Sequence, residues 1–432
     1  MRNRKLSLGL AATLAIFFTA LLMLGTPAAA QTEQALHNFS DSGDGAAPTA
    51  SLISDSSGNL YGTTSSGGAA YQNLGAVFEV TPVAGGGWTE TLLYSFSGDT
   101  DGVWPIGGLV RDGTGNLFGT TAYGGGESAT YCGQGGCGTV FELSPAAGGG
   151  WTEKVLHRFS HNGKDGVVPY ASLVVDAVGN LYGTTLTGGA YDEGTVFELT
   201  RKSGGWAENV LHSFKNNVED GQVPESSLLF DTAGKLYGTT ANGGAHNYGT
   251  VFELSRKSGG GWAEKILHSF NDNGTDGFTP AAGLILDAAG NLYGTTAAGG
   301  SSKSCVNFQL PTCGTVFEVA RKAGGVWLEK VLYDFDADTS GANPLFGSLV
   351  VDAAGDLYGT TSQGGYSSSG TVFELTRAAD GGWTETTLHL FGSGADGQNP
   401  DAGLIFGADG NLYGTTFTGG TGFQGTVFEI TP

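Results

Sequence analysis

Positive charge is scarce in this chain of 432 residues, where 19 lysines and arginines stand against 41 aspartates and glutamates. Such an acidic surface repels phosphate backbones and anionic lipid headgroups, so the composition argues against nucleic acid as a partner. Charged residues of either sign make up only 14% of the chain, whereas its 77 glycines are far above the usual share of about 7%. Few charges and abundant glycine are typical of many short strands joined by tight turns.

The sequence also lacks the local motifs of several common enzyme classes. It contains no Gly-X-Ser-X-Gly elbow, no His-Glu-X-X-His helix and no Gly-X-X-X-X-Gly-Lys loop. Its recurrent Gly-Thr-Thr-X-X-Gly-Gly follows a strand pattern but opens no helix, so a phosphate-binding loop is not supported. No catalytic residue is identified by motif.

The first thirty residues form a separate N-terminal segment. Three basic residues precede an apolar run that extends to Leu24, and three alanines before Gln31 supply the small residues of a cleavage site. The pattern predicts a secretory signal peptide at residues 1–30. An uncleaved membrane anchor is the alternative, because the apolar run is nearly as long as the roughly 20 residues that a bilayer-spanning helix needs. We expect the mature chain to be secreted, extracellular or periplasmic, and not to span a membrane.

Internal repetition dominates the rest of the chain. The motif (Asn/Lys/Asp)-Leu-(Tyr/Phe)-Gly-Thr-Thr occurs seven times, and units of about 55–57 residues, with insertions in the second and fifth, account for residues 31–432 as a single domain. The aromatic residues of the seven copies are Tyr61, Phe118, Tyr182, Tyr237, Tyr293, Tyr358 and Tyr413.

Each unit contains four short segments with the composition of β-strands. In the fifth unit these are residues 283–287, 291–296, 314–319 and 327–335, which are rich in β-branched and aromatic residues and bounded by glycines. Seven such units predict an all-β fold, a seven-bladed β-propeller of four-stranded blades, and stacked repeats leave a solenoid as the alternative.

The ends of the repeat region favour the propeller. The seventh unit stops after its third strand at Pro432, and residues 31–39 align without gaps with residues 88–96, the fourth strand of the first unit. We therefore expect the N-terminal strand to complete the last blade and close the ring, which protects the strand edges. A solenoid would need capping repeats, and none is recognisable in the sequence.

The repeats resemble a known family. The Asp-Ala-Ala-Gly-Asn-Leu-Tyr-Gly-Thr-Thr units, the Gly-Thr-Val-Phe-Glu-Leu strand and the Gly-Gly-Trp turn are similar to the GloVer-type (choice-of-anchor) tandem repeat proteins of bacteria. The resemblance covers residues 31–432 and implies secretion and a repeat fold, but no established activity. Members of that family often end in an anchoring segment, whereas this chain ends inside a predicted blade strand, so surface attachment stays open.

Recurring aspartates have a structural interpretation. An aspartate at the end of the first strand, such as Asp176 or Asp287, precedes a turn and Gly-Asn. Its carboxylate can accept the amides of a hairpin turn while the glycine adopts a positive φ.

Two glutamates recur in every unit, one in the third strand and one beside the fourth. A carboxylate pair could hydrolyse a glycoside, but seven copies give seven equivalent environments, whereas acid–base catalysis needs two carboxylates with different pKa values. We interpret both sets as hydrogen-bond partners between blades. The third-strand set is Glu79, Glu142, Glu198, Glu253, Glu318, Glu374 and Glu429, and the fourth-strand set is Glu33, Glu90, Glu153, Glu208, Glu264, Glu329 and Glu385.

Five histidines share one fourth-strand position with Tyr94 and Tyr333, which favours packing because either ring is accepted there. His161 and His246 lie outside this register, and two isolated histidines are weak evidence for zinc, so no metal site is predicted. The five in register are His37, His157, His212, His268 and His389.

An Asp-Gly-X-X-Pro sequence precedes the first strand in six units, and Ser340 replaces the aspartate in the sixth. Nearby acids in residues 41–45 and 272–276 give these loops some likeness to a calcium site, but the distal bidentate glutamate of an EF-hand is absent. We expect turns and no cofactor, with calcium as the alternative. The aspartates are Asp44, Asp101, Asp165, Asp220, Asp276 and Asp396.

The four cysteines form two local pairs, Cys132 with Cys137 and Cys305 with Cys313, one in each insertion. Export to an oxidising compartment favours two local disulfides. A shared four-cysteine zinc site is disfavoured, because the second and fifth blades of a seven-bladed ring are not neighbours.

In propellers, the loops between the second and third strands and those that lead to the next blade emerge on one face. By analogy, this face carries both disulfide insertions and a set of non-repeating aromatic residues, which can bind sugar rings or proteins or pack their own loops. These residues are Tyr71, Trp104, Tyr123, Tyr131, Tyr170, Tyr191, Tyr248, Phe278, Phe308, Phe346, Tyr366 and Phe423.

The sequence therefore favours a non-enzymatic, monomeric binding scaffold that presents this face to a glycan or an extracellular protein. One alternative is an extracellular polysaccharide hydrolase or lyase with an asymmetric site at the channel mouth among His161, Asp192, Glu193 and His246. Another is a purely structural envelope protein.

Overall fold

The computed structural model describes residues 32–432 except 41–42, 70–72, 99, 127–131, 134, 303, 306–311 and 393. The chain divides into two units, residues 1–30 and 31–432, and the described residues all belong to the second. The predicted signal peptide therefore lies outside the described residues, as do Tyr71, Tyr131 and Phe308.

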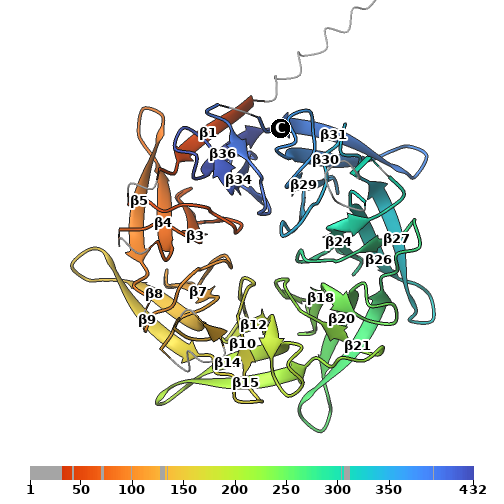
Figure 1. Ribbon diagram of the computed structural model, residues 1–432, viewed down its shortest axis with the longest axis horizontal. Coiled ribbons are helices and arrows are strands. Elements are labelled where there is room, and N and C mark those ends of the chain that lie inside the picture. The colour runs from red at the N-terminus through yellow and green to blue at the C-terminus, as the bar shows by residue number, and fades with distance from the viewer. Residues whose placement is uncertain are drawn as a thin grey trace, which may run out of the picture. The chain divides into compact units, whose positions relative to one another are not determined.

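Within the described residues, seven four-stranded antiparallel sheets are arranged as the blades of a ring, which confirms the predicted seven-bladed β-propeller (Figure 1). Blades 1 to 3 are β2 (Ile53–Ser54), β3 (Leu60–Thr64), β4 (Ala76–Pro82), β5 (Trp88–Ser95); β6 (Val110–Arg111), β7 (Leu117–Thr121), β8 (Thr139–Pro145), β9 (Trp151–Arg158); and β11 (Val174–Val175), β12 (Leu181–Thr185), β14 (Thr195–Lys202), β15 (Gly205–Ser213). Blades 4 to 6 are β17 (Leu229–Phe230), β18 (Leu236–Thr240), β20 (Thr250–Arg256), β21 (Trp262–Ser269); β23 (Ile285–Leu286), β24 (Leu292–Thr296), β26 (Thr315–Arg321), β27 (Trp327–Asp334); and β28 (Val350–Val351), β29 (Leu357–Thr361), β30 (Thr371–Arg377), β31 (Trp383–Leu390).

The N-terminal strand completes blade 7, as expected. β1 (Thr32–Asn38) pairs antiparallel with β36 (Thr426–Thr431), outside β34 (Leu412–Thr416) and β33 (Ile405–Phe406). The first described strand of the chain is thus the hydrogen-bonded neighbour of the last, and the ring is closed.

The segment that enters each blade is joined to the loop between that blade's second and third strands. In three blades an isolated bridge joins them, as between Val103 and Tyr123. Both loop sets therefore lie on one face, which we call the loop face. Elsewhere two-stranded pairs join them: β10 (Gly166–Val167) with β13 (Thr187–Gly188), β16 (Gly221–Gln222) with β19 (Asn242–Gly243), β22 (Gly277–Phe278) with β25 (Ala298–Gly299), and β32 (Gly397–Gln398) with β35 (Thr418–Gly419).

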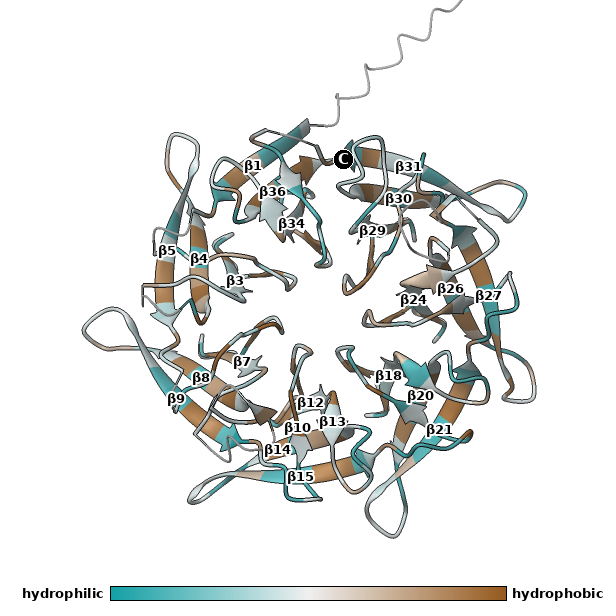
Figure 2. Cartoon of the chain, viewed as in Figure 1, coloured by the Kyte–Doolittle hydropathy of each residue, from teal (hydrophilic) through white to brown (hydrophobic). Residues whose placement is uncertain are grey.

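Burial increases from the rim toward the middle of each blade. In the first half of β5 at the rim, exposed side chains alternate with partly buried ones, and Figure 2 shows polar and apolar stretches on the rim strands. All five residues of β3 are buried, as are those of the equivalent strands of the other blades. The Leu-Tyr-Gly-Thr-Thr motif is thus the centre of the core.

The glycine of this motif is required by close packing. A Cβ atom at Gly183 would lie 2.7 Å from Phe197 Cζ and 2.9 Å from Leu173 Cδ2. The threonine that follows makes a different contact, because Thr184 Oγ1 donates to the carbonyl oxygen of Ser226 in the next blade at 3.1 Å. The motif therefore packs its own blade and bonds to its neighbour.

The first threonine of every Gly-Thr-Thr makes this bond to the next blade. The last of these bonds, from Thr415 to the carbonyl of Ala50, joins residues 365 positions apart and completes a circle of hydrogen bonds. The seven donors are Thr63, Thr120, Thr184, Thr239, Thr295, Thr360 and Thr415.

The first strands are shorter than predicted. In blade 5 the strand covers only Ile285–Leu286 of the predicted residues 283–287. Gly283 instead lines a cavity on the axis, and the carbonyl of the preceding Ala282 accepts the hydroxyl of Thr239. These residues therefore contribute to the contact between blades and do not pair within the sheet.

Replacing Gly183 by alanine tests the packing of the core. We expect Gly183→Ala to lower the free energy of unfolding by about 1–3 kcal/mol, because the new methyl group must displace the Phe197 ring. Urea unfolding measures this. Gly204→Ala, with no atom within 4 Å of its Cβ, is the control and should change stability by less than about 0.5 kcal/mol. Equal stability of the two variants would contradict the packing argument.

Candidate functional site

The segments that enter the blades line the axis, and here the repetition breaks down. Each reads Pro-X-X-X-Leu, except in blade 6, where the segment from Pro344 to Leu349 is one residue longer. A cavity of about 50 Å³ lies between them, with serines from several blades on its wall. The residues that follow the seven prolines are Thr49, Ile106, Tyr170, Glu225, Ala281, Leu345 and Asp401.

Two aromatic rings meet at this cavity. The centroids of Tyr170 from blade 3 and Phe346 from blade 6 lie 5.9 Å apart, with the rings tilted by 53°. Phe346 lies in the segment that carries the extra residue. The insertion thus coincides with a ring contact between blades that are not neighbours.

Two carboxyl groups accompany these rings. Burial raises the pKa of Asp401 to about 7 and also raises the pKa of Glu225. Burial and then the charge of Glu225, with a smaller effect of Asp401, raise the pKa of the Tyr170 hydroxyl. Neither carboxyl group belongs to the two glutamate sets that recur in all seven units. A comparison of equivalent positions in the seven units could have found both, because each occurs once at its position.

A larger pocket of about 500 Å³ opens beside the axis on the loop face. Its aromatic wall consists of Trp104, Tyr170 and Phe417, from blades 2, 3 and 7, and we call it the aromatic groove. The remaining lining residues are Thr49, Ser65, Ser66, Asn73, Leu74 and Ile106.

The backbone fixes Trp104 at this groove. Its N–H donates to the carbonyl of Leu74 in blade 1 at 2.9 Å, and its carbonyl accepts the N–H of Ala122 at 3.0 Å. Its ring meets Tyr123 edge-on, with the centroids 5.4 Å apart. Trp104 has a φ of 57°, and the residue before each of the other six prolines has a similar positive φ. Such a conformation is uncommon for a residue other than glycine, so the hydrogen bonds between blades hold it.

The structure separates the other predicted aromatic residues into two groups. Tyr248 and Phe278 pack on each other, with centroids 5.2 Å apart, and against the apolar core, which is the packing alternative. Tyr191, Tyr366 and Phe423 are exposed, at 53%, 96% and 74% of their surface. None of these five lines the aromatic groove. Phe417, which does, was missed because it directly follows a Thr-Thr pair in the repeat.

The off-register polar residues lie elsewhere than the axial cavity. His161 Nε2 is 3.1 Å from Asp192 Oδ1, and Asn216 donates to Glu193 Oε1 at 2.9 Å. His246 is exposed. The lining of the axial cavity includes none of these four residues, which the sequence analysis expected at the channel mouth.

Both predicted disulfides form, Cys132–Cys137 and Cys305–Cys313. The carbonyl of Cys137 accepts the N–H of Val168 in the next blade at 2.9 Å, and that of Cys313 accepts the N–H of Asn343 at 2.8 Å. Each disulfide therefore braces a point where the loop face joins two blades.

The interpretation of the glutamates needs correction. The Tyr182 hydroxyl donates to third-strand Glu198 at 2.6 Å within one blade, and Arg256 of the next blade adds an ion pair at 3.7 Å. In six of the fourth-strand set, the buried Oε1 atom has no hydrogen-bond partner among the described residues. The Oε1 atoms of these six glutamates therefore do not make the hydrogen bonds between blades that the sequence interpretation expected.

The in-register histidines pack and also form hydrogen bonds. The His157 ring meets Phe159 edge-on at 4.7 Å, and its Nε2 lies 3.2 Å from Asp165 of the Asp-Gly loop. Asp165 also accepts the N–H of Ser160 at 3.0 Å, as expected for a turn. Tyr94 fits the same position because its hydroxyl donates to the equivalent aspartate at 2.8 Å. Calcium at these loops stays a prediction.

The hairpin aspartates accept turn amides as expected. Asp287 Oδ1 accepts the N–H groups of Ala289 and Asn291, and Gly290 has a φ of 85°. Burial works against ionisation, but these hydrogen bonds outweigh it and lower the pKa of Asp287.

A family model described as the Gloeobacter/Verrucomicrobia repeat matches residues 22–130, 127–313 and 309–432. A search of curated proteins finds no match. Similar solved structures include the extracellular domain of a hybrid two component system from B. thetaiotaomicron, with 11% identity, a TM-score of 0.51, and 91% of this chain and 39% of that chain covered. Another is a candidate 6-phosphogluconolactonase from Bacteroides uniformis, with 12% identity, a TM-score of 0.47, and 78% and 84% covered.

At such identities the first likeness shows the fold alone. In the part of the chain that the structure describes, no helix has the length and apolar composition needed to cross a membrane.

Asp401 predicts a dependence of stability on pH. An unfolded aspartate loses its proton near pH 4, whereas the native pKa is about 7, so the folded state should lose stability as the pH rises from about 4 to 7. We expect Asp401→Asn to be more stable than the parent chain at pH 8 by about 1–3 kcal/mol and equally stable near pH 4. Urea unfolding at both pH values measures this.

Exposed Asp272→Asn is the matched control and should follow the parent chain at both pH values. If the stability of Asp401→Asn also ran parallel to that of the parent chain, the raised pKa would be wrong.

Proposed function

The chain belongs to the Gloeobacter/Verrucomicrobia repeat family, which confirms the resemblance seen in the sequence. We propose that it is a secreted scaffold that binds a neutral glycan in the aromatic groove. The observation that carries the proposal is the meeting of Trp104, Tyr170 and Phe417 from three blades at one pocket. Secretion is supported by the signal-peptide pattern and by the two disulfides, which persist in oxidising compartments.

The groove combines the two features that a sugar ring requires. Its volume of about 500 Å³ is in the usual range for small-molecule sites, and its aromatic side chains offer flat apolar faces. The hydroxyl groups of Thr49 and Ser65 donate to backbone carbonyls at 3.1 and 2.9 Å. Their lone pairs are thereby presented as acceptors for sugar hydroxyl groups.

Charge favours a neutral ligand. The chain carries a formal net charge of −22, and Glu225 and Asp401 lie near Tyr170 at the end of the groove. An anionic polysaccharide would be repelled by these groups, whereas a neutral glycan can donate hydrogen bonds to them.

A polysaccharide hydrolase or lyase is the second candidate function. The observation that favours it is that Asp401 and Glu225 both lie near Tyr170 and both have raised pKa values, which are a property of general acids. The release of new reducing ends, abolished in Asp401→Asn and Glu225→Gln, would establish this candidate in place of the scaffold.

Binding to a glycan array, followed by titration calorimetry with the best neutral oligosaccharide, tests the proposal. We expect Trp104→Ala and Phe417→Ala each to weaken binding at least tenfold, equivalent to about 1.4 kcal/mol, because each removes one aromatic face. Tyr366→Ala removes an exposed ring outside the groove and is the control, with unchanged affinity.

Thermal unfolding must show that the variants are folded. If both folded variants bound as tightly as the parent chain, the groove would not be the site, and if no glycan bound at all, the scaffold proposal would fail. Binding should occur without new reducing ends.

A further inference from the structure

A glutamate, a histidine and an aspartate meet at the junction of blades 4 and 5. Glu329 lies on β27, His268 on β21, and Asp276 in the loop that enters blade 5. One ligand atom from each lies within 4.8 Å of the others, and His268 Nε2 is 3.3 Å from Asp276 Oδ2. Two separate blades thus supply one nitrogen and two carboxylate oxygens to the same point.

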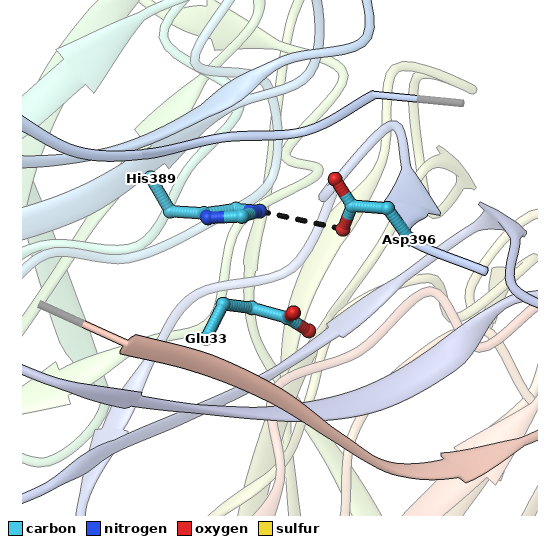
Figure 3. A group of neighbouring side chains, drawn as sticks. All are labelled: Glu33, His389 and Asp396. Carbon is cyan, nitrogen blue, oxygen red and sulfur yellow. Dashed lines mark hydrogen bonds and ion pairs between the residues drawn. The ribbon is translucent and has the colours of Figure 1, made fainter. Parts of the chain in front are cut away.

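The same three residue types meet where the ring closes. Glu33 on β1, His389 on β31 and Asp396 in the following loop point toward one another (Figure 3). His389 Nε2 lies 3.3 Å from Asp396 Oδ1. This second cluster joins blade 6 to the N-terminal strand of blade 7.

The cluster at blades 4 and 5 contains two buried carboxylate oxygens without a hydrogen-bond partner among the described residues. The side chain of Asp276 is nine-tenths buried, and within the described residues its Oδ1 atom has no hydrogen-bond partner. The buried Oε1 of Glu329 has none either. A buried carboxylate oxygen without a partner destabilises the folded state.

We propose that Glu329, His268 and Asp276 bind a zinc ion across the junction of blades 4 and 5, and that Glu33, His389 and Asp396 form a second zinc site at the ring closure. Zinc accepts histidine nitrogen and carboxylate oxygen ligands and commonly takes three protein ligands with a water in the fourth position. Calcium requires six to eight oxygen ligands, and magnesium also prefers oxygen, so neither fits a triad that includes an imidazole.

Other blade junctions of the same chain provide an internal comparison for these two sites. At two junctions the histidine position holds tyrosine, as Tyr94 and Tyr333, and the blades still pack. The same three residue types also occupy the junctions of His37, His157 and His212, but there the described side chains do not come close enough together to form such a group. A histidine-to-tyrosine change is therefore compatible with the fold and removes the nitrogen ligand.

Zinc uptake by residues 31–432 tests the proposal. The protein is treated with chelator, equilibrated with zinc chloride at pH 7.5, passed over a desalting column and analysed for metal by mass spectrometry. We expect two zinc ions per parent chain, one in His268→Tyr and none in the double variant His268→Tyr/His389→Tyr. His212→Tyr is the matched control and should keep two.

Zinc should also raise the melting temperature of the parent chain, because it binds the folded state, and this rise should disappear in the double variant. Glu329→Gln keeps the histidine and should also lose one ion. It tests the same site without depending on the folding of the tyrosine variants. The proposal is overturned if the parent chain takes up no zinc, if the double variant takes up as much as the parent, or if calcium binds in place of zinc.

Discussion

The antiparallel pairing of β1 with β36 is the constraint on which the rest of the molecule depends. Without it, seven blades would form an open array with two unpaired edges. The circle of threonine hydrogen bonds would also be incomplete, because its last member joins Thr415 to Ala50 across the closure. The aromatic groove has the same dependence, since Phe417 belongs to blade 7 and its neighbours in the groove to blades 1, 2 and 3. The candidate site exists only in the closed ring.

Residues that repeat in every unit and residues that occur only once have different roles in this molecule. Side chains that recur in all or nearly all units hold the blades together, as do the Gly-Thr-Thr threonines and the histidine–aspartate pairs. The positions that differ from blade to blade lie at the axis and on the loop face, where Trp104, Tyr170 and Asp401 each occur once in their register. A seven-fold scaffold can thus bind an asymmetric ligand without any change in the core.

Much of the fold could be predicted because the repeats, and the strands and turns within each repeat, can be recognised from the sequence alone. The ring closure follows from the spacing of the repeats, the strands from their composition, except for the length of the first strand of each blade, and the disulfides from the local pairing of the cysteines. The site could be predicted only in part: Trp104 and Tyr170 stood out as non-repeating aromatics, but whether a ring packs or faces solvent depends on residues far away in the sequence, as Tyr248 with Phe278 shows. The unpartnered fourth-strand glutamates were also beyond prediction, because repetition says which residues meet and not whether a donor is present.

The closing pair also determines when the molecule can finish folding. β1 is the first strand of the propeller to be synthesised and β36 the last, so one edge of blade 7 has no partner until Thr426 and the residues after it have left the ribosome. Contacts of such long sequence separation form late, because the entropy of closing the intervening chain must be overcome first. Six blades can assemble one after another during synthesis, whereas the seventh has to wait for the whole chain. Translation of the whole chain thus precedes the final step, and the ring cannot close before its last strand has been made.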